Sequence, residues 1–154
     1  MIEERLAELG ITLPEPPKAV GSYVPALASG RLLYISGQLP LREGAILARG
    51  PVGEACTAEQ AREAARQCVL NMLAVARHHA GSLDAISRVV QMQGYVHTPP
   101  GNPALCVPTL NAASDLLVEI LGERGRHTRA AVCAAGLPLE AALELVVVLE
   151  LEPV

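Results

Sequence analysis

The sequence predicts an α+β protein in which a mixed sheet has two helices packed on one face. The expected elements run strand, strand, short strand, helix, strand, helix, strand, strand, so hairpins stand at both ends and helices in the middle. The regular alternation of a doubly wound sheet is absent, and so is a glycine-rich phosphate loop. A length of 154 residues, of which 51% are hydrophobic, suffices for one domain with its own core.

The N-terminal segment reads as a short helix followed by an extended connector. Residues 2–9 have helical apolar spacing, and Gly10 can end this helix. Three prolines within residues 13–18 favour an extended backbone. We therefore expect a helix and proline connector over residues 1–16 and a single domain over residues 17–154.

Two strands joined by a tight turn begin the domain. Residues 23–28 and 31–36 are expected to be strands, because the Ser29-Gly30 pair between them is typical of a turn. A further short strand is expected over residues 45–48.

The two helices are the clearest elements. A capping box of Thr57 and Gln60 begins the first, over residues 58–79, and Gly81 ends it. Apolar residues recur along it every three or four positions, as a buried stripe requires: Ala61, Ala65, Cys68, Met72, Val75 and Ala76. The second helix is expected over residues 108–121.

Three more strands are expected. One covers residues 86–97, and its alternation places four residues on one face: Val89, Gln91, Gln93 and Tyr95. The other two cover residues 129–135 and 141–150, and we expect them to form a hairpin that turns at Gly136-Leu137-Pro138.

The last strand has one apolar face and one mixed face. Its odd-numbered residues form the apolar face: Leu143, Leu145, Val147, Leu149 and Leu151. On the mixed face Glu144 and Glu150 stand among small and branched apolar residues, so another subunit is expected to cover it. Partial burial raises the pKa of a carboxyl group and suits Glu144 to acid–base chemistry. The alternative is a rim glutamate whose carboxylate ends in water.

The preceding strand supplies a cation. Arg129 shares a face with small neighbours that leave space beside its guanidinium: Ala131, Cys133 and Ala135. Such an arginine can bind a carboxylate through two parallel hydrogen bonds. The expected hairpin would bring Arg129 within a few residues of Glu144. An ordinary interface salt bridge is the alternative role for Arg129.

Composition argues against several classes of function. Twelve basic and 16 acidic residues give a formal charge of −4, and three Tyr with no Phe or Trp leave few rings for base stacking, so we expect no nucleic-acid partner. The chain begins without the basic and apolar regions of a signal peptide and lacks an apolar stretch of about 18 residues. A cytoplasmic protein with no membrane contact is therefore expected.

The reactive residue types form no familiar motif. The four cysteines are widely spaced, so buried thiols are expected rather than disulfides. The four histidines lack metal-ligand spacing, so no metal site is expected. Ser36 lies outside a Gly-x-Ser-x-Gly elbow, which argues against a serine hydrolase.

Six segments together resemble a known family: Gly21-Ser22-Tyr23, the stretch from Tyr34 to Pro40 (Tyr-Ile-Ser-Gly-Gln-Leu-Pro), Asn111, Arg129, Gly136-Leu137-Pro138 and Glu144. Over about residues 17–152 the sequence is similar to the YjgF/RidA family of reactive enamine/imine deaminases, also called the endoribonuclease L-PSP family. The initial helix and proline connector resemble its longer-chain branch.

This resemblance implies a chorismate-mutase-like fold in a homotrimer whose three sites lie at the subunit interfaces. The implied substrates are 2-aminoacrylate and related 2-enamine and 2-imine carboxylic acids, which water converts into 2-keto acids and ammonia. The implied reaction uses no cofactor, and the implied ligand is a small carboxylate.

The resemblance also implies roles for individual residues. Arg129 matches the carboxylate-binding arginine, and Glu144 matches the acid–base residue that handles the attacking water. Tyr23, Ser36 and Asn111 match residues that line the pocket. Many members carry Cys two residues after the arginine; Ala131 stands there in this chain, so only its backbone can contact the substrate.

Two other functions fit parts of this pattern. A regulatory trimer that binds a small carboxylate without turnover would need Arg129 but not Glu144. An endoribonuclease is less expected, because the chain is acidic and poor in aromatic residues.

Overall fold

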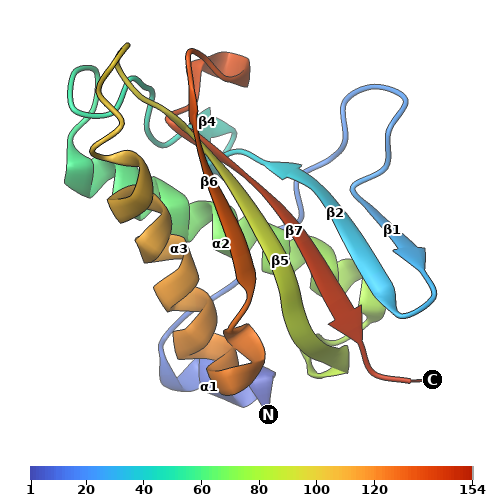
Figure 1. Ribbon diagram of the computed structural model, residues 1–154. Coiled ribbons are helices and arrows are strands. Elements are labelled where there is room, and N and C mark those ends of the chain that lie inside the picture. Colours follow the sequence, from blue (N-terminus) through green and yellow to red (C-terminus); the bar gives the residue numbers. More distant parts are fainter. Residues whose placement is uncertain (154) are drawn as a thin grey trace.

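The α+β class is confirmed by the computed structural model, which describes residues 1–153 (Figure 1). Val154, the last residue of the expected domain, lies outside the described residues. Five strands form one sheet in the order β1 (Ala26–Ser29), β2 (Leu32–Gln38), β7 (Leu143–Leu151), β5 (Ile86–His97) and β6 (Thr128–Ala134). Two helices, α2 (Ala58–Ala80) and α3 (Cys106–Leu121), cover one face of this sheet, and α1 (Ile2–Glu8) packs at the end of α3.

Helix α2 begins and ends where the sequence predicts. The Thr57 hydroxyl accepts from the Gln60 backbone N–H at 3.1 Å, and the Gln60 side chain accepts from the Thr57 N–H at 2.9 Å. Gly81 ends the helix in the left-handed region, with φ of 80°. Neither α2 nor another helix within residues 1–153 combines the length and apolar character needed to cross a bilayer.

The core lies between these helices and the sheet. Leu143, Leu145, Val147 and Leu149 of β7 are at most 1% exposed, which confirms the predicted apolar face of the last strand. Cys68, Met72 and Val75 of α2 are also buried. The predicted stripe of α2 therefore packs against the predicted face of β7.

The predicted C-terminal hairpin is wrong. Strand β6 pairs in parallel with β5, while β7 lies antiparallel between β2 and β5. The chain therefore passes from β6 across β5 through a short 3-10 turn, η3 (Pro138–Glu140), before β7 begins. The reason is burial: β7 is apolar or semi-apolar on both faces and gains most in the sheet centre, whereas the exposed residues of β6 suit an edge.

Two of the first strands, β1 and the short strand expected over residues 45–48, are shorter than expected. Strand β1 begins at Ala26, so residues 23–25 precede the sheet instead of belonging to it. Residues 45–48 contribute only β4 (Ala45–Ile46), which pairs with β3 (Leu41–Arg42) in a separate hairpin. Its turn uses positive φ angles at two adjacent residues, Glu43 and Gly44, as a tight two-residue hairpin turn requires.

A β-bulge in β5 corrects the predicted face of that strand. The register against β7 shifts between Val89 and Gln91, so one extra residue is inserted there. Val89 consequently faces the helices and is 1% exposed, while Gln91, Gln93 and Tyr95 share the opposite face. A two-residue alternation does not reveal such an insertion.

Candidate active site

The expected site residues form two groups that one chain does not bring together. Arg129 and Asn111 are bonded to each other between β6 and α3. Ser36 and Glu144 belong to β2 and β7 in the middle of the sheet, and Tyr23 lies in the segment before β1.

Strand register shows that Arg129 and Glu144 point to opposite faces. Arg129 lies opposite Met92 of β5, and Glu144 lies opposite Tyr95 of the same strand. Met92 and Tyr95 are three residues apart in a regular stretch, so their side chains, and those of their partners, leave opposite faces. The expectation that Arg129 lies close to Glu144 within one chain is therefore wrong, because it depended on the hairpin.

Arg129 is held by two side chains of α3. Its Nη1 donates to the Asn111 Oδ1 at 2.9 Å and to the Ser114 Oγ at 3.1 Å. Asn111 and Ser114 are three positions apart and therefore lie on one face of the helix. Within residues 1–153 Arg129 forms no ion pair, and its Nε and Nη2 have no hydrogen-bond acceptor. The guanidinium therefore presents a free edge to a ligand.

His127 extends this group and was not predicted as a site residue. Its Nε2 lies 3.0 Å from the Ser114 Oγ, and its Nδ1 lies 2.6 Å from the Gly125 carbonyl oxygen. Two sequence spacings could have indicated the cluster: His127 and Arg129 are two apart at the start of a strand, and Asn111 and Ser114 are three apart on a helix.

Glu144 occupies the open face of the sheet, the face that α2 and α3 leave uncovered. Its side chain is partly buried, and this burial raises the pKa of its carboxyl group above the ordinary value. Gly37 of β2 makes room for it, since a Cβ at that position would overlap the Glu144 carboxylate oxygen. Glycine at residue 37 thus lets the acid lie directly against the β2 backbone.

A cavity of about 350 Å³ adjoins Gly37. Tyr23 and Ser36, for which the resemblance implies a role in the substrate pocket, contribute to its wall, and so do Lys18 and Leu139. The Ser36 hydroxyl donates to the Val24 carbonyl oxygen at 2.6 Å, so it fixes the segment before β1 over the cavity. The wall is mainly apolar and can accept a small organic side chain, and its link to the acid is Gly37, which Glu144 contacts.

Ala131 belongs to the arginine group and not to this cavity. It lies opposite Gly94 in the parallel pairing and is two residues from Arg129, on the same face of β6. Its side chain is exposed. Ala131 therefore leaves open space beside the guanidinium, as expected.

The Cys106 thiol near this group is unsuited to nucleophilic chemistry. Burial, and next the hydrogen bond with Cys133, raise the pKa of the Cys106 thiol to about 11. Cys133 is exposed at the sheet edge, contrary to the expectation of a buried thiol. In the described part of the chain no group of three or more His, Cys, Asp or Glu is placed to hold a metal ion.

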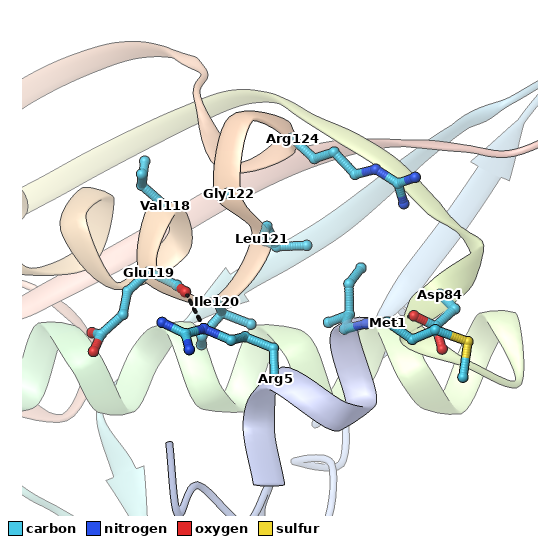
Figure 2. Close-up of a pocket in the computed structure, with 10 residues that line it drawn as sticks. Met1, Arg5, Asp84, Val118, Glu119, Ile120, Leu121, Gly122 and Arg124 are labelled. Carbon is cyan, nitrogen blue, oxygen red and sulfur yellow. Dashed lines mark hydrogen bonds between the residues drawn. The ribbon is translucent and has the colours of Figure 1, made fainter. Parts of the chain in front are cut away.

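A larger cavity, of about 800 Å³, lies elsewhere and contains no expected site residue. Figure 2 shows that it forms where α1 meets the end of α3. Arg5 donates to the Glu119 carbonyl oxygen at 3.1 Å, Arg124 donates to the Ile86 carbonyl oxygen, and Asp84 accepts from the Ile2 N–H at 2.6 Å. These polar groups already form hydrogen bonds within the protein, so we assign this cavity to the packing of α1 against α3 and not to a binding site.

Comparison with known proteins gives one consistent set of similarities. A family model described as "YjgF/chorismate mutase-like, putative endoribonuclease" matches residues 3–151. Protein TCP17 of Trypanosoma cruzi is 35% identical over 151 residues, which are 97% of this chain and 94% of that protein. Atu1372 of Agrobacterium tumefaciens, a protein of unknown function, is 41% identical with a TM-score of 0.90 over 98% of this chain and 92% of its own. A Shewanella oneidensis protein described as a "putative endoribonuclease" is 32% identical with a TM-score of 0.93 over 98% of this chain and 99% of its own.

Proposed function

Since this chain belongs to the YjgF/chorismate mutase-like family, we propose that it hydrolyses small 2-enamine and 2-imine carboxylic acids to 2-keto acids and ammonia. The observation that carries the proposal is Glu144, a partly buried carboxyl group with a raised pKa that lies against Gly37, and Gly37 lines a small, mainly apolar cavity. A group of this kind can both take and return a proton.

The proposed reaction uses the two groups in different roles. Arg129 binds the substrate carboxylate and so orients the imine carbon. Glu144 takes a proton from water, and the resulting hydroxide adds to the carbon of the protonated C=N group to give a neutral tetrahedral amino alcohol. Glu144 then returns the proton to the amine nitrogen. As the C–N bond breaks, the Glu144 carboxylate takes the hydroxyl proton, so that the keto acid and ammonia leave, and ammonia carries this proton away as ammonium. An enamine first becomes an imine by protonation at its terminal carbon.

A homotrimer with shared sites is part of the proposal. Arg129 and Glu144 leave opposite faces of the sheet, so a substrate that touches both requires the Arg129 of one copy and the Glu144 of a neighbour. Several exposed apolar residues favour such a contact: Leu27, Tyr34 and Val132 are 61%, 46% and 41% exposed. In a closed ring of three copies, each copy would make the same contact with its neighbour, so all three interfaces would be equivalent.

Two alternatives remain for the experiment to separate. A non-catalytic trimer that binds a small carboxylate would use Arg129 without needing Glu144. An endoribonuclease, as the Shewanella relative is described, would bind a polyanion, which the formal charge of −4 disfavours.

The test is the substitution Glu144→Gln, which keeps the shape of the side chain but cannot take a proton. Turnover of enzymatically generated 2-aminoacrylate and of bulkier imines should fall roughly 10²–10⁴-fold. Binding of pyruvate should change far less, because Arg129 supplies the charge. The matched control is Glu150→Gln on the same face of β7, where the carboxylate pairs with Arg31 and Arg88 instead of facing Gly37.

The other outcomes identify the alternatives. Wild-type protein that binds pyruvate but turns over none of the imines is a carboxylate-binding protein. RNA cleavage by the same preparation, lost in Glu144→Gln, would indicate the endoribonuclease. Unchanged imine turnover in Glu144→Gln would remove Glu144 from the reaction.

A further inference from the structure

Ser114 and His127 form a chain of hydrogen bonds that ends on Arg129. The direction of this chain follows from Gly125, because a carbonyl oxygen can only accept. His127 Nδ1 therefore carries a proton and donates to it across 2.6 Å. In the neutral ring Nε2 is then an acceptor, so the Ser114 hydroxyl donates to it across 3.0 Å. The lone pairs of the Ser114 Oγ remain available to accept from Arg129 Nη1 at 3.1 Å.

This chain fixes which edge of the guanidinium is free. Nη1 has two hydrogens, and both are used, one by the Asn111 Oδ1 and one by the Ser114 Oγ. Two acceptors on one nitrogen hold the guanidinium plane against rotation. The N–H groups of Nε and Nη2 remain free and are parallel to each other. They form the side-on edge that a carboxylate binds through two parallel hydrogen bonds.

We propose that Ser114 and His127 are positioning residues that hold Arg129 so that its Nε and Nη2 receive the substrate carboxylate. The inference rests on the proposed function for the identity of the ligand. The positioning of Arg129 depends only on the hydrogen bonds within the protein. His127 acts only through Ser114, and Ser114 acts only through Arg129. Neither residue touches the substrate.

A Ser–His pair can also indicate a nucleophile and its base, but its surroundings here favour positioning. The Ser114 hydroxyl accepts from a fixed guanidinium, and Arg129, to which it is bonded, leaves the opposite face of the sheet from Glu144. A fluorophosphonate probe that labelled wild-type Ser114 would show a nucleophile and would overturn the positioning role.

The experiment compares variants that remove an acceptor with variants that retain one. Ser114→Ala and His127→Leu break the chain, whereas Ser114→Thr keeps the hydroxyl and His127→Gln keeps an acceptor near the position of Nε2. His78→Gln, at the far end of α2, is the matched histidine control. Each full-length variant is first checked for an unchanged thermal unfolding midpoint.

The first readout is the affinity for pyruvate. Ser114→Ala and His127→Leu should each raise the Kd about tenfold, as expected for the loss of a hydrogen bond to a charged group. Ser114→Thr and His127→Gln should stay within about threefold of the wild type. The double variant Ser114→Ala/His127→Leu should bind no more weakly than either single variant, because both substitutions break the same series of hydrogen bonds to Arg129.

The second readout does not depend on activity. Restricted rotation should give separate NMR signals for the two Nη nitrogens of Arg129 in the wild type and merged signals in Ser114→Ala and His127→Leu. The inference would be overturned if the two Ser114 variants and the two His127 variants all had the same Kd for pyruvate. It would also be overturned if the Arg129 Nη signals stayed separate in His127→Leu. Wild-type protein that fails to bind pyruvate would overturn the assignment of the ligand. Protein that passes both readouts but hydrolyses no imine would retain the inference and lose the proposed function.

Discussion

At the scale of single residues, the surroundings of Glu144 decide what its carboxyl group can do. The side chain has apolar neighbours on the open face and the bare backbone of Gly37 beside it. Charge is poorly solvated there, so the protonated form is favoured relative to a carboxyl group in water. Glu150, on the same face of the same strand, meets two arginines instead. Identical side chains six residues apart therefore have different chemistry.

The raised pKa of Glu144 predicts a pH-dependent difference in stability. The folded chain binds this proton more tightly than the unfolded chain, so the favourable contribution is complete below the ordinary pKa of 4.5 and is lost as the pH rises through the folded value. At pH 7 Glu144→Gln should therefore unfold at a higher temperature than the wild type, and the gap should close below pH 4.5. Thermal midpoints at fixed protein concentration measure this.

The control for that prediction is Glu150→Gln. It removes two ion pairs, at 3.4 and 3.9 Å, and should show no gain in unfolding temperature at pH 7. A gap for Glu144→Gln that widens as the solution becomes acidic would contradict the assigned direction of the shift.

Several single residues could be assigned from sequence, and others could not. The alternation of the last strand was sufficient to place Glu144 on a mixed face and the leucines in the core. The positions of Ser114 and His127 depend on how α3 lies against the sheet edge, a contact between distant segments that no local pattern encodes. Val89 was misplaced because a bulge changes the face of every residue on one side of it.

At the scale of elements, α2 supports the open face from behind. Asn71 is 1% exposed, and its Nδ2 donates to the carbonyl oxygens of Leu39 and Leu41 at 3.1 and 2.9 Å. Its Oδ1 accepts from Gln67 at 3.0 Å. The segment that follows Gly37 is therefore tied to a rigid helix, which keeps the β2 backbone in place against Glu144.

Replacement of Asn71 should destabilise the protein, because it removes a hydrogen-bond donor from the backbone carbonyl groups that Asn71 contacts. Asn71→Ala removes a donor from two part-buried carbonyl oxygens. The Leu39 oxygen keeps the Leu41 N–H at 2.8 Å, so the main cost, about 1–3 kcal/mol if water does not reach it, falls on the Leu41 oxygen. Urea unfolding at fixed protein concentration should show a lower midpoint with an unchanged slope. Glu63→Gln, which removes only the exposed pair with Arg42, should change the free energy of unfolding by less than about 0.5 kcal/mol. Equal effects of the two substitutions would refute the role of Asn71.

Helices were easier to predict than strand pairing. A capping box and a stripe of apolar residues are local signals, and α2 follows them to within one residue at its end. The order of strands is a global property, set by which strands gain most from burial on both faces. The last two strands therefore looked like a hairpin in sequence, although β5 separates them.

At the scale of the whole molecule, the sheet separates a cation from an acid. The helices occupy one face of the sheet (Figure 1). The open face carries Glu144, and Arg129 of the edge strand β6 donates to α3. A chain that catalysed the proposed reaction alone would need both groups on one side. The fold therefore favours a site completed by a second copy, and light scattering should give about three times 16.1 kDa.

Mixed oligomers test the shared site directly. Arg129→Lys keeps the charge but loses the planar fork, and Glu144→Gln loses the exchangeable proton, so each variant alone should be nearly inactive. The two variants are unfolded together in equal amounts and then refolded. An interface has both native groups when its Arg129 comes from a Glu144→Gln chain and its Glu144 comes from an Arg129→Lys chain. Random assembly of a closed ring makes about one quarter of the interfaces of this kind. Turnover should therefore rise to about a quarter of the wild-type value.

The same mixture distinguishes a shared site from a site within one chain. If Arg129 and Glu144 of the same chain acted together, every chain in the mixture would carry one defect, and mixing would restore nothing. Refolding each variant separately and mixing afterwards is the control for subunit exchange, and it should stay inactive for as long as the rings stay closed. Activity that returns only in the co-refolded sample would place the two groups on neighbouring copies, since no chain in that sample has both.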